Sequence, residues 1–136
     1  MAQRMIAAAG LVSVASLALA LSAAPGLADG CPVYPDDRKN LVYSIVNEQH
    51  LVRDSHIGQD GCGLYLAIII GHAANEDYAR EVGDNMVRLT KSLGPGPGPA
   101  RDIGKGIYDY TIGVYRPDKT RIAIGAKNRS AKRILW

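Results

Sequence analysis

The feature that most constrains this chain is an unbroken apolar run from Leu64 to Ile70, with the sequence LYLAIII. The run is too short for a buried helix, and its three consecutive isoleucines favour an extended backbone. Because no charged residue interrupts it, the run predicts a central strand that is covered on both faces. Such a strand needs neighbouring strands and a layer of helices, so we expect an α/β fold.

A helix is predicted directly after this strand. Asn75 is a preferred N-cap, and Glu76 and Asp77 place negative charge in the first turn. Gly94 is a natural stop for this helix. A helix here would allow the next strand to run parallel to the first through a right-handed crossover. Apolar residues recur at helical spacing between the two ends, at Tyr78, Val82, Met86, Leu89 and Leu93.

Three further elements complete the predicted fold. Apolar spacing predicts a first helix from about Asp37 to Arg53, after which glycines break the pattern over residues 56–63. The segments 107–116 and 122–126 alternate apolar and polar residues around the turn Pro117–Thr120, which predicts a β-hairpin. We therefore expect a small single-domain α/β sandwich with a mixed sheet, in the order helix, strand, helix, strand, strand.

The N-terminus has the composition of a secretory signal peptide. Arg4 precedes an uncharged stretch, and Pro25 and Gly26 stand before small residues. We expect cleavage after Ala28, so that residues 1–28 are a signal peptide and residues 29–136 a single exported domain without a stable membrane span. Localisation would be extracellular in a eukaryote and periplasmic in a Gram-negative bacterium. The alternative is an uncleaved anchor, although alanine, glycine and serine would make it a weak one.

The two cysteines, Cys31 and Cys62, are expected to form a disulfide, because exported proteins fold in an oxidising compartment. Two free thiols are the alternative. A redox role is disfavoured, since the pair lacks the C-x-x-C spacing that tunes reactive cysteines.

Charge is distributed unevenly along the chain. Residues 29–100 have a net balance of −4, whereas residues 101–136 have a balance of +6. A basic half is able to bind a macromolecular partner with an acidic surface, a phosphorylated ligand or an anionic surface, and the export signal argues against nucleic acid. For the charge taken alone, the preferred interpretation is an ordinary solvated edge whose lysine and arginine side chains discourage aggregation. The candidate binding residues are those of the types common at interfaces, Tyr115, Arg116, Arg121, Arg129 and Arg133.

Metal and catalytic motifs are weak in this sequence. His50, Asp54 and His56 lie close together, but a zinc site needs more ligands, and surface histidines account for the same residues. His72 follows the apolar strand, where α/β sheets often have a binding crevice, or it is satisfied by nearby backbone. We therefore expect no metal and no cofactor. Asn128 begins an N-x-S sequon, whose use depends on the source organism.

The chain resembles the TPM domain family, nearest to its exported branch, the modulators of levamisole receptor. The resemblance spans about residues 37–133 and rests on the strand Leu64–Ile70, the helix start Glu76–Ala79, a Gly-rich crossing and the hairpin with its strand Arg121–Gly125. Some TPM domains are linked to acid phosphatase activity or calcium binding. They usually carry an Asp-Asn-Gly step before the hairpin, where this chain has Gly104–Ile107.

Two functions from different classes follow. The favoured one is a non-catalytic secreted binding module, with a membrane receptor or an envelope component as the expected kind of partner. The resemblance implies the alternative, a small phosphatase-like hydrolase. In that case His72, Asp77 and Asp102 would be acid–base or metal groups, and the basic end would hold phosphate. A purely structural envelope protein is a third possibility.

Overall fold

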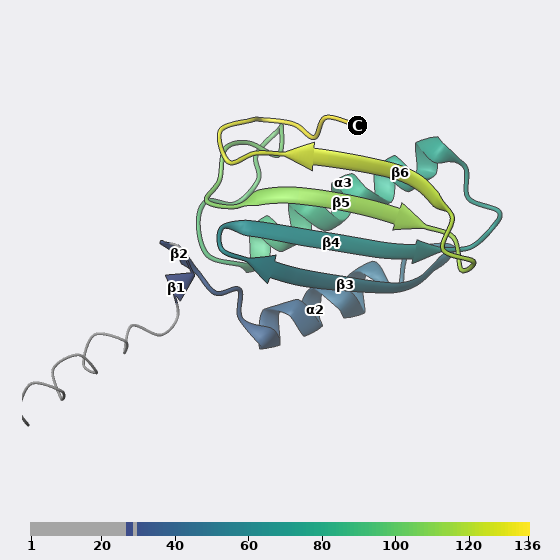
Figure 1. Cartoon of the computed structure of the whole chain (residues 1–136), viewed down its shortest axis with the longest axis horizontal. Coiled ribbons are helices and arrows are strands. Elements are labelled where there is room, and N and C mark those ends of the chain that lie inside the picture. Colours follow the sequence, from purple (N-terminus) through teal and green to yellow (C-terminus); the bar gives the residue numbers. More distant parts are fainter. Residues whose placement is uncertain (1–26, 29) are drawn as a thin grey trace, which may run out of the picture.

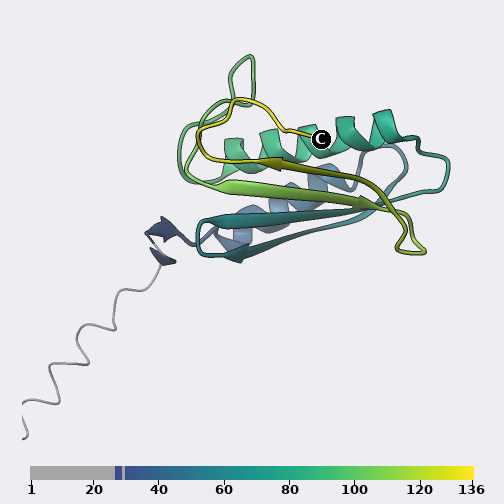
Figure 2. The same cartoon turned by 45° about the horizontal axis from the view of Figure 1, so that its top comes forward.

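The computed structural model describes residues 27, 28 and 30–136 of the chain. It is a two-layer α/β sandwich, in which two helices pack on the same face of a four-stranded mixed sheet (Figures 1 and 2). The expected fold class is therefore confirmed. The predicted signal peptide lies outside the described residues, except for Leu27 and Ala28, which form the short strand β1.

The sheet has the strand order β3-β4-β5-β6. Strands β4 and β5 are parallel and are joined through helix α3, which is the predicted crossover, while both outer pairs are antiparallel. The last two strands form the predicted hairpin. The bounds are Val52–Asp60 for β3, Gly63–Ile70 for β4, Asp109–Tyr115 for β5 and Arg121–Lys127 for β6.

Helix α3, Glu76–Leu93, begins and ends where the sequence predicts. The side chain of Asn75 accepts a hydrogen bond of 2.8 Å from the backbone N–H of Tyr78, which satisfies one of the free donors of the first turn. Gly94 caps the other end. The face that packs on the sheet buries mainly apolar residues, including Ala79, Val82, Met86 and Val87.

Helix α2, Asp36–Val46, is shorter than predicted. The expectation that it continues to Arg53 is wrong, because the backbone turns after Asn47 and Leu51 has a φ of 67°, outside the right-handed helical region. Leu51 and Val52 still pack against the core, but from a turn and a strand. Leu51 and Val52 are apolar because they pack against the same core as α2, so their positions in the sequence look like a continuation of the helical pattern.

Strand β3 stands between the first predicted helix and the apolar strand, where no strand was predicted. It is an edge strand with only Ser55 and Ile57 buried, so its sequence VRDSHIGQD shows no clear apolar alternation. A two-residue turn joins it to β4, and Gly61 in that turn has a φ of 62°, which favours glycine.

Strand β4 is central, as predicted, but it is covered on one face only. Leu64, Leu66, Ile68 and Ile70 are buried beneath the helices. Tyr65, on the opposite face, is 49% exposed, and the two residues that follow on that face are half-buried. The expectation of two covered faces is therefore wrong, because both helices lie on one side (Figure 2).

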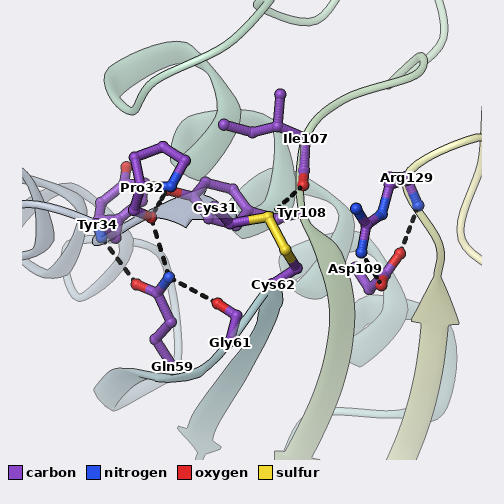
Figure 3. Close-up of a disulfide and its surroundings, with 10 residues drawn as sticks. All are labelled: Cys31, Pro32, Tyr34, Gln59, Gly61, Cys62, Ile107, Tyr108, Asp109 and Arg129. Carbon is purple, nitrogen blue, oxygen red and sulfur yellow. Dashed lines mark hydrogen bonds and ion pairs between the residues drawn. A yellow bond between two sulfur atoms is a disulfide. The ribbon is translucent and has the colours of Figure 1, made fainter. Parts of the chain in front are cut away.

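The segment before α2 is tied to the sheet by the predicted disulfide, which is confirmed. Cys31, in the short strand β2 (Cys31–Pro32), is bonded to Cys62 in the β3–β4 turn, with 5.2 Å between the two Cα atoms (Figure 3). The Gln59 side chain accepts from the Tyr34 N–H at 2.8 Å and donates to the Pro32 carbonyl at 3.0 Å. The disulfide and these bonds hold the segment against the end of the sheet.

The last residues return along the free edge of β6. Leu135 and Ala126 exchange two backbone hydrogen bonds of 2.8 and 2.9 Å. Trp136 lies on the helix side of this pair, against Gly125 and Gly83. Because paired residues of neighbouring strands share a face, Leu135 points to the opposite side with Ala126, and it is 79% exposed.

Candidate binding surface

The five predicted binding residues lie at two opposite ends of the sheet. Tyr115, Arg116 and Arg121 flank the β5–β6 turn, whereas Arg129 and Arg133 follow the far end of β6 (Figure 1). Seven residues of β6 separate the two groups by roughly 20 Å. The structure therefore does not bring the five residues into one contact surface.

Arg129 and Arg133 are each paired with an aspartate. Arg129 donates its backbone N–H to Oδ1 of Asp109 at 2.7 Å and Nη2 to Oδ2 at 3.1 Å (Figure 3). The hydrogen bond from the Arg129 side chain is the main cause of the lowered pKa of Asp109, and the bond from the Arg129 backbone adds to it. Nε of Arg133 lies 3.3 Å from Oδ1 of Asp102. Arg129 thus tethers the C-terminal segment to the start of β5, and Arg133 tethers it to the loop after α3.

Arg53, Arg116 and Arg121 gather at the other end of the sheet, and we call these three residues the arginine end. None of them takes part in an ion pair with another described residue. Nη2 of Arg53 lies 3.6 Å from the position that a Cβ on Gly71 would take, just beyond β4. Sequence reasoning missed Arg53 because it placed this residue in a helix.

The register shows that this grouping is compact. Tyr115 pairs with Ile69 on one side and with Arg121 on the other, and Ile69 pairs in turn with Asp54, the residue after Arg53. Four strands about 4.8 Å apart place the three guanidinium-bearing residues within about 15 Å. The carboxyl ends of the two parallel strands meet here, where α/β sheets commonly bind ligands.

His72 and Asp118 lie at the same end. Thr120 donates its backbone N–H to Oδ1 of Asp118 at 2.9 Å, and its hydroxyl donates to the same oxygen, so the carboxylate closes its own turn. The hydroxyl of Thr120 is the main cause of the lowered pKa of Asp118, and the charges of His72 and Arg116 contribute less. Asp118 supplies one negative charge beside three arginines, so it neutralises the arginine end only in part.

The three residues of the hydrolase alternative are not brought to one site. His72 and Asp77 lie near the start of α3, whereas Asp102 follows its end and faces Arg133. The 18 residues of α3 span about 27 Å. Over residues 30–136, no group of three His, Cys, Asp or Glu side chains could hold a metal ion, and this includes the region of His50 and His56.

The Gly104–Gly106 stretch surrounds a buried ammonium group. Nζ of Lys91 donates to the backbone carbonyls of Ile103, Gly104 and Lys105 at 3.0, 3.3 and 2.7 Å. Burial lowers the pKa of Lys91. The loop that follows α3 is therefore organised around a lysine of the same chain. Only its position four residues after Val87, on the buried helix face, could have indicated this role.

A depression of about 380 Å³ lies between α2 and the edge of β3. None of the five predicted binding residues lines it. The Tyr43 hydroxyl accepts the Ile57 N–H at 2.9 Å there, so the aromatic side chain caps the backbone of the edge strand. The other lining residues are Asp36, Lys39, Asn40 and His56.

In the part of the chain that the structure describes, helices are too short or too polar to cross a bilayer. Comparisons of the chain with protein-family models, with curated proteins and with solved structures find no match.

Proposed function

We propose that this chain is a non-catalytic, secreted binding module whose arginine end contacts an acidic surface on a protein partner. One observation carries the proposal. Arg53, Arg116 and Arg121 lie at one end of the sheet without an ion pair to any other residue that the structure describes, whereas Arg129 and Arg133 are each matched by an aspartate.

Guanidinium groups suit this role because they form charge-assisted, bidentate bonds with carboxylates. Tyr115 pairs with Arg121 across the hairpin and is half-buried, so its ring offers a preorganised apolar contact beside the charges. Complementary charge also speeds the encounter with an acidic partner. The disulfide supports secretion into an oxidising compartment, where a membrane receptor or an envelope component is the expected kind of partner.

The TPM family is part of this proposal. The resemblance rests on a strand, a helix start, a Gly-rich crossing and a hairpin, and β4, α3, the loop after α3, β5 and β6 follow one another in this order. The receptor-modulator branch of that family is exported, which fits a role in binding.

A charge-reversal experiment tests the proposal. The probe is a glutamate-rich peptide, and its affinity for the exported protein is measured by calorimetry at low and physiological salt. We expect Arg116→Glu combined with Arg121→Glu to weaken binding at least tenfold, because two attractions become repulsions. The matched control is Arg101→Glu combined with Lys132→Glu, which makes the same charge change at exposed positions elsewhere. Its affinity should stay within about twofold.

Two outcomes would overturn the proposal. An equal loss in both double variants would mean that net charge alone attracts the peptide. Binding of a sulfated polysaccharide, without any binding of the peptide, would exclude a protein surface as the natural ligand.

The hydrolase alternative requires a different result. Hydrolysis of a generic phosphomonoester with divalent metals supplied, abolished by His72→Ala, would replace the binding proposal with a catalytic one. The separation of His72 from Asp102 by the length of α3 gives this alternative no shared site.

A further inference from the structure

The face of the sheet opposite the helices carries three exposed large apolar side chains. Tyr65 on β4 is 49% exposed, Ile124 on β6 is 46% exposed, and Leu135 beside β6 is 79% exposed. We call these three residues the open-face patch. Monomeric soluble proteins seldom leave such residues clustered unless the cluster binds something.

The register makes the open-face patch continuous. Tyr65 pairs with Thr111, Thr111 with Ala126, and Ala126 with Leu135, so these residues form one row across the sheet. Ile124 stands two residues along β6 from Ala126 and therefore shares the face. Thr111 and Ala126 lie between Tyr65 and Leu135. The ring of Tyr115 lies over Gly113, the residue that pairs with Ile124, so the aromatic surface continues from Ile124 toward the arginine end.

The open-face patch leads directly to the arginine end. Beyond the row of Ile124 comes the row that holds Tyr115 and Arg121. The face thus runs from the row of Asp60 and Asp109, where Asp109 is paired with Arg129, across the open-face patch to the cationic row of Arg121. Asp54 is the acid in that last row, and its Oδ1 accepts the N–H of Ser55, which engages part of its charge locally.

The size of the face argues against a second copy of this chain as the occupant. Four strands of about seven residues give a face of roughly 20 by 20 Å, or about 400 Å². Two copies packed face to face would bury about 800 Å² in total, below the roughly 1,200 Å² of stable specific interfaces. A transient contact with a partner segment needs less buried area than a stable dimer does.

The backbone limits the occupant further. The N–H and C=O groups of β4 and β5 are paired with neighbouring strands, so the face offers no backbone partners. An occupant must satisfy its own backbone groups, which a helix does internally. A helix on this side would mirror the packing of α2 and α3 on the other (Figure 2).

We propose that an amphipathic helix of the protein partner docks on the open-face patch, with acidic residues at one end of that helix bound by the arginine end. This inference rests on the proposed function and names the form of the partner. The partner segment is recognised by an apolar stripe and a terminal cluster of carboxylates.

The test compares designed peptides by nuclear magnetic resonance titration of the exported protein. One peptide is helical, with an apolar stripe and glutamates at one end. A second has the same composition with the stripe scrambled, and a third has glutamines in place of the glutamates. We expect the first to bind about tenfold or more tightly than either of the others, because each lacks one half of the contact. Amide shifts should map to Tyr65, Thr111 and Ile124.

Matched variants locate the contact. A variant that combines Tyr65→Ser, Ile124→Ser and Leu135→Ser removes the open-face patch and should weaken the binding of the first peptide at least tenfold. The control is Leu41→Ser with Ile45→Ser, which removes exposed apolar side chains from α2 on the other layer, and it should leave the affinity within about twofold. Thermal melts check that both variants remain folded.

The outcomes separate this inference from the proposed function. If the scrambled peptide binds as tightly as the first, the open face is not used, although the arginine end still is. If the glutamine peptide binds as tightly, the face is used but the acidic partner is wrong. The proposal that a helix docks on the open-face patch is wrong if none of the peptides binds. It is also wrong if the protein binds anionic lipid vesicles but none of the peptides.

Discussion

The indole of Trp136 occupies the space in which a side chain on Gly83 would begin. A Cβ built on Gly83 would lie 2.5 Å from Cη2 of Trp136 and 3.2 Å from Cγ2 of Ile112. The same ring lies over Gly125, where a Cβ would be 2.7 Å from Cε3. One glycine in α3 and one in β6 therefore form the slot that holds the C-terminal segment against the fold.

This contact predicts that Gly83→Ala destabilises the protein although alanine is the better helix former. The helix would gain up to about 1 kcal/mol, but overpacking typically costs about 1–3 kcal/mol. We expect a net loss of about 1 kcal/mol in the free energy of unfolding, measured by urea denaturation.

The control for this prediction is the same substitution in a Trp136→Ala background. With the ring removed, Gly83→Ala should be neutral or stabilising by up to about 1 kcal/mol, since Ile112 alone is close. Equal effects of Gly83→Ala in both backgrounds would mean that the indole does not fill this slot in solution.

The disulfide predicts a large redox effect on stability. Cys31 and Cys62 are separated by 31 positions, and closing a loop of that size contributes about 3–4 kcal/mol in the chain-entropy description. Cys31→Ser combined with Cys62→Ser should lower the free energy of unfolding by this amount. Added reductant should destabilise the natural protein equally and leave the double variant unchanged. A change below about 1 kcal/mol would show that hydrogen bonds from Tyr34, Gln59 and Tyr108 already hold the segment.

The elements that could be predicted are those whose local signals agree with their packing. Helix α3 has a capping residue, acids in its first turn, an apolar stripe and a terminal glycine, and each has its expected place. The hairpin alternates because β5 and β6 each bury one face, so Tyr110, Ile112 and Val114 are all buried. Consistent local signals of this kind identify an element from the sequence alone.

The elements that could not be predicted lack such agreement. Strand β3 is an edge strand, and its buried Ser55 is satisfied by Asn47 rather than by apolar contacts, so no alternation marks it. The apolar letters of β4 suggested two covered faces, but hydrophobic residues also occur on exposed surfaces. Whether Tyr65 is covered or exposed depends on the face on which the two helices pack, and this is a property of the whole fold.

The candidate binding residues illustrate a similar limit. Five residues near one another in the sequence suggested one basic face, but the turn of the hairpin and the end of β6 lie at opposite ends of the sheet. Asp109 and Asp102 then pair with Arg129 and Arg133 from distant parts of the chain. Sequence reveals the number of charges, whereas tertiary structure decides which of them are neutralised.

The three hydrogen bonds from Lys91 predict that the structure of the loop after α3 depends on a single ammonium group. Lys91→Met would leave the carbonyls of Ile103, Gly104 and Lys105 without this donor, and we expect a loss of about 2–3 kcal/mol in the free energy of unfolding. The matched control is Lys105→Met, which removes an exposed lysine from the same loop and should change stability by less than about 0.5 kcal/mol.

Amide hydrogen exchange locates the effect of Lys91→Met. The N–H groups of Gly104 and Gly106 donate to the carbonyls of Lys132 and Arg129, each at 2.9 Å. Their exchange should accelerate more than that of the Asp109 amide, which bonds to the Cys62 carbonyl beside the disulfide. Uniform acceleration would indicate global destabilisation and would contradict a local role for the lysine.

Three buried tyrosines make the protein sensitive to alkali. The hydroxyl of Tyr34 donates to the Thr90 carbonyl at 2.8 Å, and that of Tyr108 donates to the Pro32 carbonyl at 2.6 Å. Burial raises the pKa of each of these two residues to about 12 and also raises that of Tyr110. The folded state therefore retains these protons at a pH at which the unfolded chain, with an ordinary tyrosine pKa of about 10, releases them.

The sign of the pH dependence follows from linkage. Because the folded pKa lies above the unfolded value, the tyrosine contribution to stability is complete below about pH 10 and is lost between about pH 10 and pH 12. Burial lowers the pKa of Lys91 and Lys127, which favours the folded state as pH rises toward about 10.5 and partly offsets the loss. Three tyrosines against two lysines give a net fall above about pH 10.

Urea denaturation at about pH 8 and about pH 11 checks this prediction, with tyrosine ionisation followed by ultraviolet absorbance. We expect the unfolding midpoint to fall at the higher pH and the absorbance change to accompany unfolding. Tyr108→Phe should be less stable by about 1 kcal/mol near neutrality, because it loses the bond to Pro32, yet should show a shallower alkaline decline. An unchanged midpoint at the higher pH would mean that these phenols ionise as freely in the folded protein as in the unfolded chain.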